Sequence, residues 1–566
     1  MRSTSTSTST STPDGTGRRP RTAAPRHPSL TDRLAARLAE ATVFGRRIGD
    51  LRDELRRRAV PTHWTNLFGV VTLACLVVVA VTGLWLMFFY TPSSDLTTYR
   101  GGYAPLHGAE TSEAFASTMR LTFDVPGGLL MRQAHHWAAL LLPASIIMQL
   151  VATFFTGGFR RPRRGMWVLL FLIFVAALAG GWSGYALPDD LLSGTGLRIT
   201  EGIALGIPVV GTWLASLLFG GGFPGRIIEH LYPLHVAIVP AVLVGLVALR
   251  AVAAWRAGPA QFPGPGRSAT RVVGAPLVPT AAARAGGLFL LVTGVLLAIS
   301  ATVTVNPLQL YGPASSGDAG AGSQPDWYTG FLDGALRLVP SGWEVVLFDR
   351  TWTLAILVPL AVVTVFLVLV AVYPFVEEWA TGDRRDHHLL ERPRLAPTRT
   401  GIGVAGIVFY GVLWTAGSAD LIATQFRVSF EGVIGMLQAL LIVGPCIGFG
   451  VARRVCLGLQ RRDRDVLEHG FETGRLVRLP GGEVVEVHQR VGETERVRMS
   501  RAEPRVMLVL RPDERGRLPL ARRVQVRLGR WFLADSIDAE SGVRVLPAPV
   551  AASSSTPAER ERTLAS

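Results

Sequence analysis

The sequence predicts an all-α polytopic membrane protein with about eight transmembrane helices and a charged C-terminal tail. Of its 566 residues 49% are hydrophobic, and the mean hydropathy is positive, which argues against one ordinary soluble domain. Apolar runs of about twenty residues with almost no charge recur along the first four-fifths of the chain. Each run is long enough to cross roughly 30 Å of hydrocarbon as a helix rising about 1.5 Å per residue.

The first segment, residues 1–60, is polar and precedes every apolar run. It opens on a Ser-Thr repeat, a composition typical of disorder, and no cleavable signal peptide is expected there. Within this segment, residues 31–59 combine helically spaced Leu, Ala and Val with many arginines. The pattern predicts an amphipathic helix on the membrane surface, although a solvated helix would have the same pattern.

Eight apolar runs follow, of which the seventh is the weakest. Runs one to four form a predicted four-helix bundle within residues 61–257, and the later runs belong to a C-terminal unit, residues 258–456. Residues 457–566 form the tail, where stretches such as "RRVQVRLGRWFLADS" (522–536) alternate as short strands would. The approximate bounds of the runs are 66–90, 133–155, 167–187, 233–255, 286–305, 352–375, 402–417 and 432–452.

Arginine is concentrated in every second loop between the apolar runs. The net charge is +15, the chain contains no lysine, and the second loop, "GGFRRPRRG" (157–165), is strongly basic. The fourth and sixth loops are also basic, whereas the odd-numbered loops are closer to neutral. Because positive loops stay in the cytoplasm, both termini are expected there, in a protein of the cell membrane. This distribution favours membrane orientation over nucleic-acid binding, the usual alternative for so basic a chain.

The third loop (188–230) and the fifth loop (306–351) are long and rich in Gly, Pro and Trp. Loops of this length between membrane helices are usually functional or partly helical. The three cysteines form no C-x-x-C pair, which argues against a zinc knuckle, a covalent c-type haem motif or a disulfide framework.

Histidines lie near the outer ends of two apolar runs: His135 and His136 in the second, His235 in the fourth. Under the predicted topology they lie at equal depth. Histidine is costly in lipid, and neutral imidazoles from facing helices are a usual way to hold the iron of a b-type haem. Histidines hydrogen-bonded between helices would explain the same pattern.

Three neighbouring residues favour the haem interpretation. Gly83 in the first run and Gly184 in the third lie at matching depth, and a mid-helix glycine usually marks a close approach, such as that of a flat macrocycle. Tight helix packing is the competing explanation for these glycines. Arg132 lies one turn before His135, where its guanidinium can pair with a haem propionate.

Taken together, these motifs resemble cytochrome b of the quinol–cytochrome c reductase (cytochrome bc) complex, in its long eight-helix menaquinol form. The resemblance runs from about Pro61 to His488. It is carried by "HWTNLFG", "TGLWL", "RQAHHWAAL", "GYALPDDLLSGTGLR", "IPVVGTWL", "LYPLH", "QFPGPGR", "QPDWY", "YPFVEEW" and "RDVLEHGFETG". It implies that residues 61–257 bind haem b and that Arg132, His135 and His235 hold the outer haem.

The resemblance also implies a quinol-oxidation pocket on the outer side. The family's P-E-W-Y tetrapeptide, which lines that pocket, reads Pro325-Asp326-Trp327-Tyr328 here, with a shorter carboxylate. The expected partners are a Rieske iron–sulfur protein, a cytochrome c subunit and a second copy of the chain. The expected substrate is a quinol, menaquinol by the form of the chain.

The inner haem site of the family is altered at four positions. Histidine ligands are expected fourteen or fifteen residues beyond the outer pair, about 21 Å deeper. Those positions hold Gln149 and Arg250, and neither residue is a normal axial ligand of haem iron. Ala152 replaces an expected arginine, and Leu170 replaces a clearance glycine, while Gly69 is kept. A rescue by Met148 is the bland alternative, although Met148 lies about 100° off the ligand face.

Three functions remain open at this point: a working cytochrome b subunit with two haems, a divergent single-haem paralogue with another electron acceptor, and a non-catalytic membrane scaffold. The remaining candidates each have an ordinary alternative. His136 is expected to pack or hydrogen-bond between helices. His230 is a loop-end histidine or a propionate contact. His387, His388 and His469 are expected to be solvated. Tyr185, Tyr232 and Trp327 line the quinol pocket or an aromatic interface belt.

Overall fold

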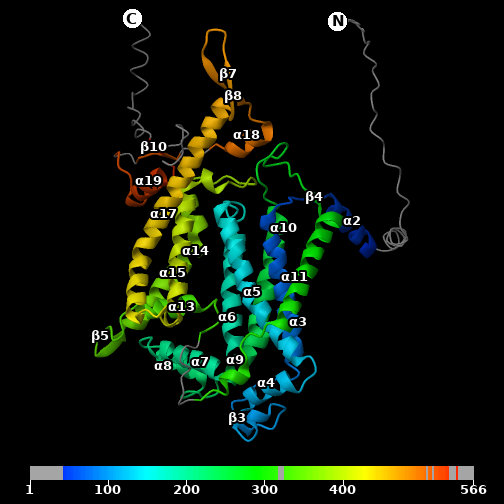
Figure 1. The fold of residues 1–566 in the computed structure, drawn as a ribbon, viewed down its shortest axis with the longest axis vertical. Coiled ribbons are helices and arrows are strands. Elements are labelled where there is room, and N and C mark those ends of the chain that lie inside the picture. Colours follow the sequence, from blue (N-terminus) through cyan, green and yellow to red (C-terminus); the bar gives the residue numbers. More distant parts are fainter. Residues whose placement is uncertain (1–42, 316–323, 505–507, 513–515, 534–542, 546–566) are drawn as a thin grey trace, which may run out of the picture.

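The computed structural model describes residues 43–315, 324–504, 508–512, 516–533 and 543–545 (Figure 1). Within these residues, eight helices are long and apolar enough to cross a membrane, which confirms the predicted number. The seventh has the lowest hydropathy, as expected. The spans are Trp64–Leu86, Gly128–Phe155, Arg164–Tyr185, Ile227–Ala257, Leu277–Thr302, Leu354–Thr381, Pro397–Ala416 and Phe430–His469.

The first bundle consists of α3 (Leu67–Leu86), α5 (Gly128–Phe155), α6 (Arg164–Tyr185) and α10 (Val239–Ala257). Helix α5 packs against α3 and α6, and α6 packs against α10. On α5 the buried side chains recur every four residues, at Ala134, Ala138, Leu142 and Ile146, so one stripe of the helix faces the bundle. Because lipid is as apolar as leucine, small residues in this stripe favour the fold by close packing of the helix backbones.

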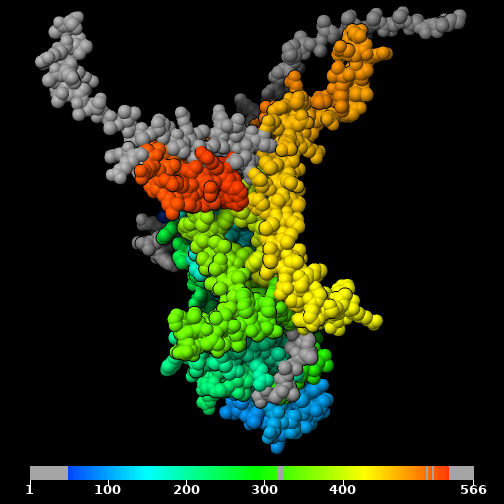
Figure 2. Space-filling view, turned by 90° about the vertical axis from the view of Figure 1, so that its left-hand side faces the viewer, coloured from blue at the N-terminus to red at the C-terminus, as the bar shows by residue number. Residues whose placement is uncertain are grey.

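The second half of the chain adds four helices. Helix α11 (Ala282–Thr302) packs on α3 and α5, and α14 (Leu354–Thr381) contacts α6. Helix α15 (Pro397–Ala416) packs along α17 (Phe430–His469), with α13 (Gly330–Arg337) against it. Helix α17 has 40 residues and continues beyond the predicted end at 452. Its last turns therefore project from the membrane body, as the yellow helix shows in Figures 1 and 2.

Helices α4 (Glu113–Phe123), α7 (Leu191–Leu205), α8 (Gly211–Phe219), α9 (Ile227–Pro233) and α13 lie toward one end of the bundle, the lower part of Figure 1. Residues 325–328 come directly before α13 in the chain, and this end is hereafter called the PDWY end. The third loop is partly helical there, as expected, and two small hairpins occur. Its helices are α7, α8 and α9; the hairpins pair β2 (Leu96–Thr98) with β3 (Glu110–Ser112) and β5 (Glu344–Leu347) with β6 (Arg350–Thr353).

The basic second loop lies at the opposite end, hereafter the arginine end. Helix α2 (Val43–Arg57) and the tail elements lie there too, so the described parts nearest the two termini share one end (Figure 1). Other elements at this end are β1 (Ala59–Val60) paired with β4 (Ala275–Pro276), β7 (Phe471–Arg478) paired with β8 (Val484–Gln489), α18 (Glu493–Met499), α19 (Leu520–Leu533), and β9 (Leu508–Leu510) paired with β10 (Val543–Val545).

Short helical segments also occur elsewhere along the described chain. They are Trp64–Asn66, Ala104–Leu106, Leu234–Ile238, Leu277–Ala281, Leu308–Tyr311, Pro393–Leu395 and Ala419–Phe426.

The prediction of strands in "RRVQVRLGRWFLADS" is wrong for residues 522–533, because this stretch lies in helix α19. Gln525, Gly529, Phe532 and Leu533 are buried, a helical spacing that the local alternation of valine and arginine conceals. Gln525 Nε2 donates to the carbonyl of Trp379 at 2.8 Å, which ties α19 to the end of α14. Figure 2 shows α19, in orange-red, covering this end of the bundle beside α17. Residues 534–536 lie outside the described residues.

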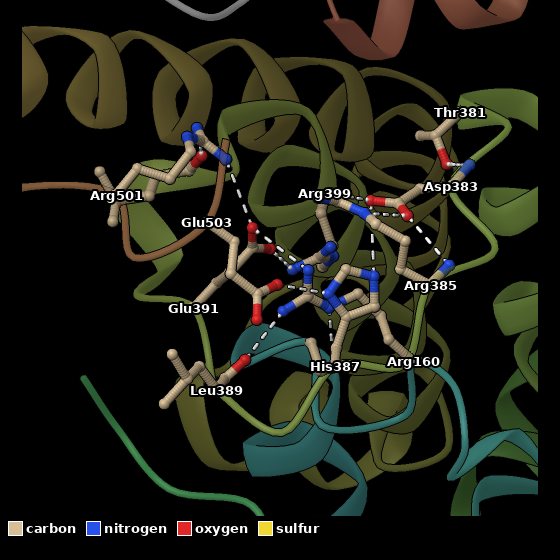
Figure 3. A network of polar contacts seen from close by, with 12 residues as sticks. Arg160, Thr381, Asp383, Arg385, His387, Leu389, Glu391, Arg399, Arg501 and Glu503 are labelled. Atoms are coloured by element: carbon tan, nitrogen blue, oxygen red, sulfur yellow. Dashed lines mark hydrogen bonds and ion pairs between the residues drawn. The ribbon is translucent and has the colours of Figure 1, made fainter. Parts of the chain in front are cut away.

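A cluster of charged side chains joins the tail to the membrane helices (Figure 3). Arg399 on α15 is 6% exposed and donates Nε to both oxygens of Glu377 at 3.0 and 3.1 Å, and Nη1 to Glu391 at 2.8 Å. Arg501 of the tail lies 3.3 Å from the same Glu391. Each buried charge in this cluster is therefore paired with an opposite charge, and the partners come from segments far apart in the sequence.

His387 belongs to this cluster, so the prediction that it is solvated is wrong. Its ring is 3% exposed, with Nδ1 2.7 Å from Glu503 and Nε2 3.4 Å from Asp383. The adjacent His388 is also partnered, because Arg163 Nη2 donates to its Nδ1 at 3.1 Å. The partner Glu503 lies 116 residues away in sequence, which is why a local pattern did not reveal the contact.

We expect the contribution of His387 to stability to fall as the pH rises above neutrality. Burial alone lowers the pKa of His387, but hydrogen bonds to Asp383 and Glu503 outweigh it, and the net pKa is raised above 6.5. A raised pKa means that the stabilisation is complete below about 6.5 and is lost as pH rises through the folded-state pKa. The measurement compares the melting temperatures of the detergent-solubilised wild type and His387→Gln from pH 6 to 9. A difference that stays constant with pH would contradict this prediction.

Candidate cofactor site

His135 on α5 and His235 at the start of the fourth span face each other near the PDWY end. Their ring centroids are 6.1 Å apart. Two imidazoles bound to one metal ion through bonds of about 2.0 Å place their ring centres roughly 6 Å apart. The two histidines singled out from the sequence are therefore spaced as a pair of ligands to one ion. They lie on different helices, so the packing of the first bundle brings them together.

Each of these imidazoles is oriented through its Nδ1 atom. His135 Nδ1 lies 3.1 Å from Thr82 Oγ1 on α3, and His235 Nδ1 lies 3.2 Å from Ser183 Oγ and 3.1 Å from the Gly180 carbonyl on α6. These three hydrogen bonds all use Nδ1, and none of them uses Nε2 of either ring. A ligand histidine is commonly held in this way, with one ring nitrogen fixed by a neighbour and the other left for the metal. Sequence reasoning missed Thr82 and Ser183.

Gly83 and Gly184 give the two rings their space. A Cβ at Gly83 would lie 3.0 Å from His135 Cε1, and one at Gly184 would lie 2.4 Å from His235 Cε1. A side chain at either position would displace an imidazole. The glycines thus mark a close approach, as expected, and the group that approaches is the histidine ring.

His235 lies in a π-helical turn, Leu234–Ile238, inside the fourth span. Pro240 follows and lacks an N–H group, so the carbonyl four residues earlier loses its α-helical donor. Single π-turns of this kind interrupt the regular rotation of a helix and occur often at functional sites. The turn helps to set the direction of the His235 ring.

Arg132, one turn before His135, is buried with unused donors. It is 8% exposed, and its Nη1 lies 3.4 Å from the carbonyl of Asn306. Its Nε and Nη2 have no hydrogen-bond partner. A buried guanidinium with free N–H groups is costly unless a carboxylate or phosphate pairs with it. This arrangement fits the carboxylate of a haem propionate beside the facing histidines.

The tetrapeptide Pro325–Tyr328 packs beside this pair, against α5. Asp326 Oδ1 lies 3.1 Å from His136 Nε2, and Tyr328 donates its hydroxyl to Asp326 Oδ2 at 2.8 Å. Trp327 Nε1 donates to the carbonyl of Leu140 at 3.2 Å. Tyr328 is 1% exposed. The structure therefore brings the predicted quinol-pocket residues and the predicted haem ligands to the same end of α5.

The other candidates at this end have ordinary partners. His230 is exposed, with Nδ1 3.0 Å from the carbonyl of Leu218. Tyr185 donates its hydroxyl to the carbonyl of Leu192 at 3.2 Å, and the Tyr232 ring lies 5.6 Å from the ring of Tyr90. These contacts support a structural role for His230 and leave the two tyrosines at the rim of the PDWY end.

The inner position on α5 is occupied by a side-chain hydrogen-bond network. Gln149 is 7% exposed and donates Nε2 to Thr72 Oγ1 at 2.6 Å, and Thr72 lies 2.7 Å from Ser145 Oγ. A Cβ at Gly69 would lie 3.7 Å from Gln149 Oε1, an ordinary contact distance. The amide therefore fills the space between α3 and α5 at this depth.

Apolar packing fills the rest of the inner position. Leu170 is 2% exposed and belongs to the same core cluster as Leu142, Ile146 and Trp167. Ala152 is half-buried and offers no polar group. The residues present here do not fit a haem, because a macrocycle needs the volume that Leu170 and its neighbours occupy.

No described residue replaces the missing inner ligands. Met148 is 42% exposed and therefore points away from the bundle, which removes the rescue considered above. Arg250 has a buried Nε without a hydrogen-bond partner, and among the described hydrogen bonds none joins it to Gln149.

Comparison with known proteins shows the family of the chain. Residues 140–313 match the family model described as "Cytochrome b(N-terminal)/b6/petB". The cytochrome bc1 complex cytochrome b subunit of Streptomyces coelicolor is 44% identical over 440 residues, covering 78% of this chain and 81% of the relative. The protein of the same name from Mycobacterium leprae is 42% identical over 470 residues, covering 83% and 85%.

A solved structure shares the fold. A chain of a structure described as "Hyperthermophilic respiratory Complex III" superposes with a TM-score of 0.53 at 19% identity. The match covers 74% of this chain and all of that chain. At this identity the likeness concerns the arrangement of the helices, and it extends over both halves of the membrane body.

Proposed function

The chain belongs to the cytochrome b family of bc1 complexes, and from this membership we propose that it oxidises quinol at the PDWY end with a single haem b. The observation that carries the proposal is the facing pair His135 and His235, with both Nε2 atoms directed to no protein partner and the unpaired guanidinium of Arg132 beside them. The enzyme is the whole complex, a quinol–cytochrome c oxidoreductase in which this chain is the cytochrome b subunit.

Each residue of the site has a separate task. His135 and His235 would hold the haem iron, Arg132 would bind a haem carboxylate, and Gly83 and Gly184 leave room for the imidazole rings. A haem held there supplies one-electron transfer. Thr82 and Ser183 hold the imidazoles through Nδ1, so that the ligand geometry is set before the cofactor binds.

Pro325, Asp326, Trp327 and Tyr328 form the quinol site in this proposal. A carboxylate has about four acceptor positions, and the contacts to His136 and Tyr328 use two of them. Asp326 therefore retains acceptor capacity for the hydroxyl proton of a quinol. Trp327 and Tyr328 are fixed by their own hydrogen bonds and supply the aromatic walls against which a quinol ring packs.

The inner site takes no part in the proposed reaction. Gln149, Ala152, Leu170 and Arg250 occupy the family's inner haem position, and an electron that crossed to the arginine end without a cofactor would face a gap of about 20 Å. Both electrons of the quinol therefore leave on the side of the PDWY end. This observation favours a second candidate function within the same family: a divergent paralogue that passes its electrons to a different electron acceptor.

We further propose the setting of the chain. The partners are a Rieske iron–sulfur protein, a cytochrome c subunit and a second copy of the chain. The quinol is menaquinol. Residues 61–257 form the haem-binding unit, and residues 258–456 form the unit that carries the quinol loop. Because positively charged loops stay in the cytoplasm, we assign the arginine end, and with it both termini, to the cytoplasmic side. The described segments nearest the two termini, α2 and the tail, share that end, which agrees with two termini on one side of the membrane.

The test is the haem b content per chain of the purified complex, together with haem reduction by an added menaquinol analogue. One haem that the quinol reduces is the expected result. Two haems would overturn the single-haem proposal and restore a conventional reductase. A chain without haem and without quinol oxidation would leave only a scaffold role.

A further inference from the structure

The adjacent residues His135 and His136 of α5 serve two different centres. Successive residues of a helix point about 100° apart, so two neighbouring imidazoles diverge. The His135 ring faces His235, whereas His136 Nε2 lies 3.1 Å from Asp326 Oδ1. Asp326 is 190 residues further along the chain. The same turn of α5 thus contacts both the haem position and the carboxylate of the quinol loop.

We propose that His136 is a positioning residue for quinol oxidation, which holds the Asp326 carboxylate in place through a hydrogen bond from Nε2. The inference rests on the function proposed above and deepens it. With the proton on Nε2, the ring donates to Oδ1, while the Tyr328 hydroxyl donates to Oδ2. The carboxylate is therefore held from two sides.

Helix α5 holds the same loop at a second point. The Trp327 indole donates to the carbonyl of Leu140, one helical turn beyond His136. The His136 and Asp326 side chains are 17% and 10% exposed, so water competes little for this contact. Gly181 on α6 allows the approach of Tyr328, because a Cβ there would lie 2.5 Å from the phenol. Of these contacts, only those of His136 and Tyr328 reach the carboxylate itself.

The hydrogen bonds from His136 and Tyr328 fix the orientation of the Asp326 carboxylate and thus the direction of its two remaining acceptor positions. Loss of one donor therefore lets the carboxylate rotate. A displacement of about 1 Å at a reacting group can cost roughly 100-fold in rate. His136→Leu removes the donor at similar volume, whereas His136→Gln keeps an amide N–H at about the same reach. We expect His136→Leu to lower kcat by about 10- to 100-fold with little change in KM, and His136→Gln to recover most of the rate.

The experiment measures menaquinol-analogue oxidation by the purified complex for wild type, His136→Leu, His136→Gln and Asp326→Asn. In an Asp326→Asn background the His136→Leu change is expected to cost less than about threefold, because the two residues act as one unit. An equal loss in both backgrounds, or no rescue by glutamine, would overturn the proposal. A fall in haem content in His136→Leu would also overturn it, by assigning the residue to cofactor binding. His230→Leu is the matched control, since His230 is exposed and bonds to a backbone carbonyl.

A second readout separates this inference from the proposed function. The infrared carboxylate band that disappears in Asp326→Asn reports on the Asp326 hydrogen bonds whether or not the complex turns over. A shift of that band in His136→Leu, reversed in His136→Gln, supports the positioning contact. A band that His136→Leu leaves in place overturns it. If the variants show this shift but the wild-type complex does not oxidise quinol, the proposed function alone is refuted.

Discussion

Replacement of His135 or His235 by leucine is expected to lower the haem b content of the purified chain from one to none. A haem held there would lose one of the two histidines proposed to hold its iron, and leucine offers no replacement. The two ring centroids are 6.1 Å apart, and among the described residues no group of three or more His, Cys, Asp or Glu side chains could hold a metal ion, so neither histidine has a substitute nearby. Haem content by pyridine haemochrome and the reduced-minus-oxidised spectrum provide the measurement.

Two matched variants control for general unfolding. Gln149→Leu removes the amide at the inner position, and His230→Leu removes an exposed histidine at the PDWY end; both are expected to retain one haem. Haem retained in both His135→Leu and His235→Leu would refute the assignment of the outer ligands. Haem lost on changing Gln149 would show that the inner position binds the cofactor after all.

Arg399→Met is expected to lower the free energy of unfolding by about 3–5 kcal/mol. Glu377, 5% exposed, would remain as a buried carboxylate without its cation, and this is the situation in which breaking a buried ion pair is strongly destabilising. Methionine keeps much of the volume, so the cavity contribution stays small. Denaturant or thermal unfolding of the purified protein in detergent, followed by helical circular dichroism, gives the value.

The control for that prediction is the double variant Arg399→Met with Glu377→Leu. It removes both buried charges and should regain most of the lost stability, since apolar residues of similar volume can replace a buried pair at little cost. Glu391 keeps Arg160 and Arg501 within 3.3 Å in both variants. A double variant as unstable as the sum of the two single variants would contradict the ion-pair explanation.

The membrane architecture was predictable from local patterns. A helix that spans lipid satisfies its backbone internally, so the length of an apolar run suffices to identify it, and all eight runs are spans. Most bounds differ by a few residues because polar ends such as Arg164 and Thr381 continue the helix beyond the apolar stretch, and the eighth helix continues furthest, to His469. Helix α19 was mistaken for strands because its buried face is defined by contact with α14 and α15, and a short alternating stretch fits both periods.

The sequence singled out His135, His235 and the glycines beside them by their positions in the apolar runs. The replaced inner positions followed from the resemblance to cytochrome b, and helical periodicity puts residues 14 or 15 apart on nearly the same face of one helix. Only the tertiary structure decided the hydrogen-bond partners of the polar side chains: Gln149 bonds to Thr72, His136 to Asp326, and His387 to Glu503. These partners lie 77, 190 and 116 residues apart in the chain. No local periodicity relates such distant residues, because which faces of two helices meet depends on the packing of all the helices between them.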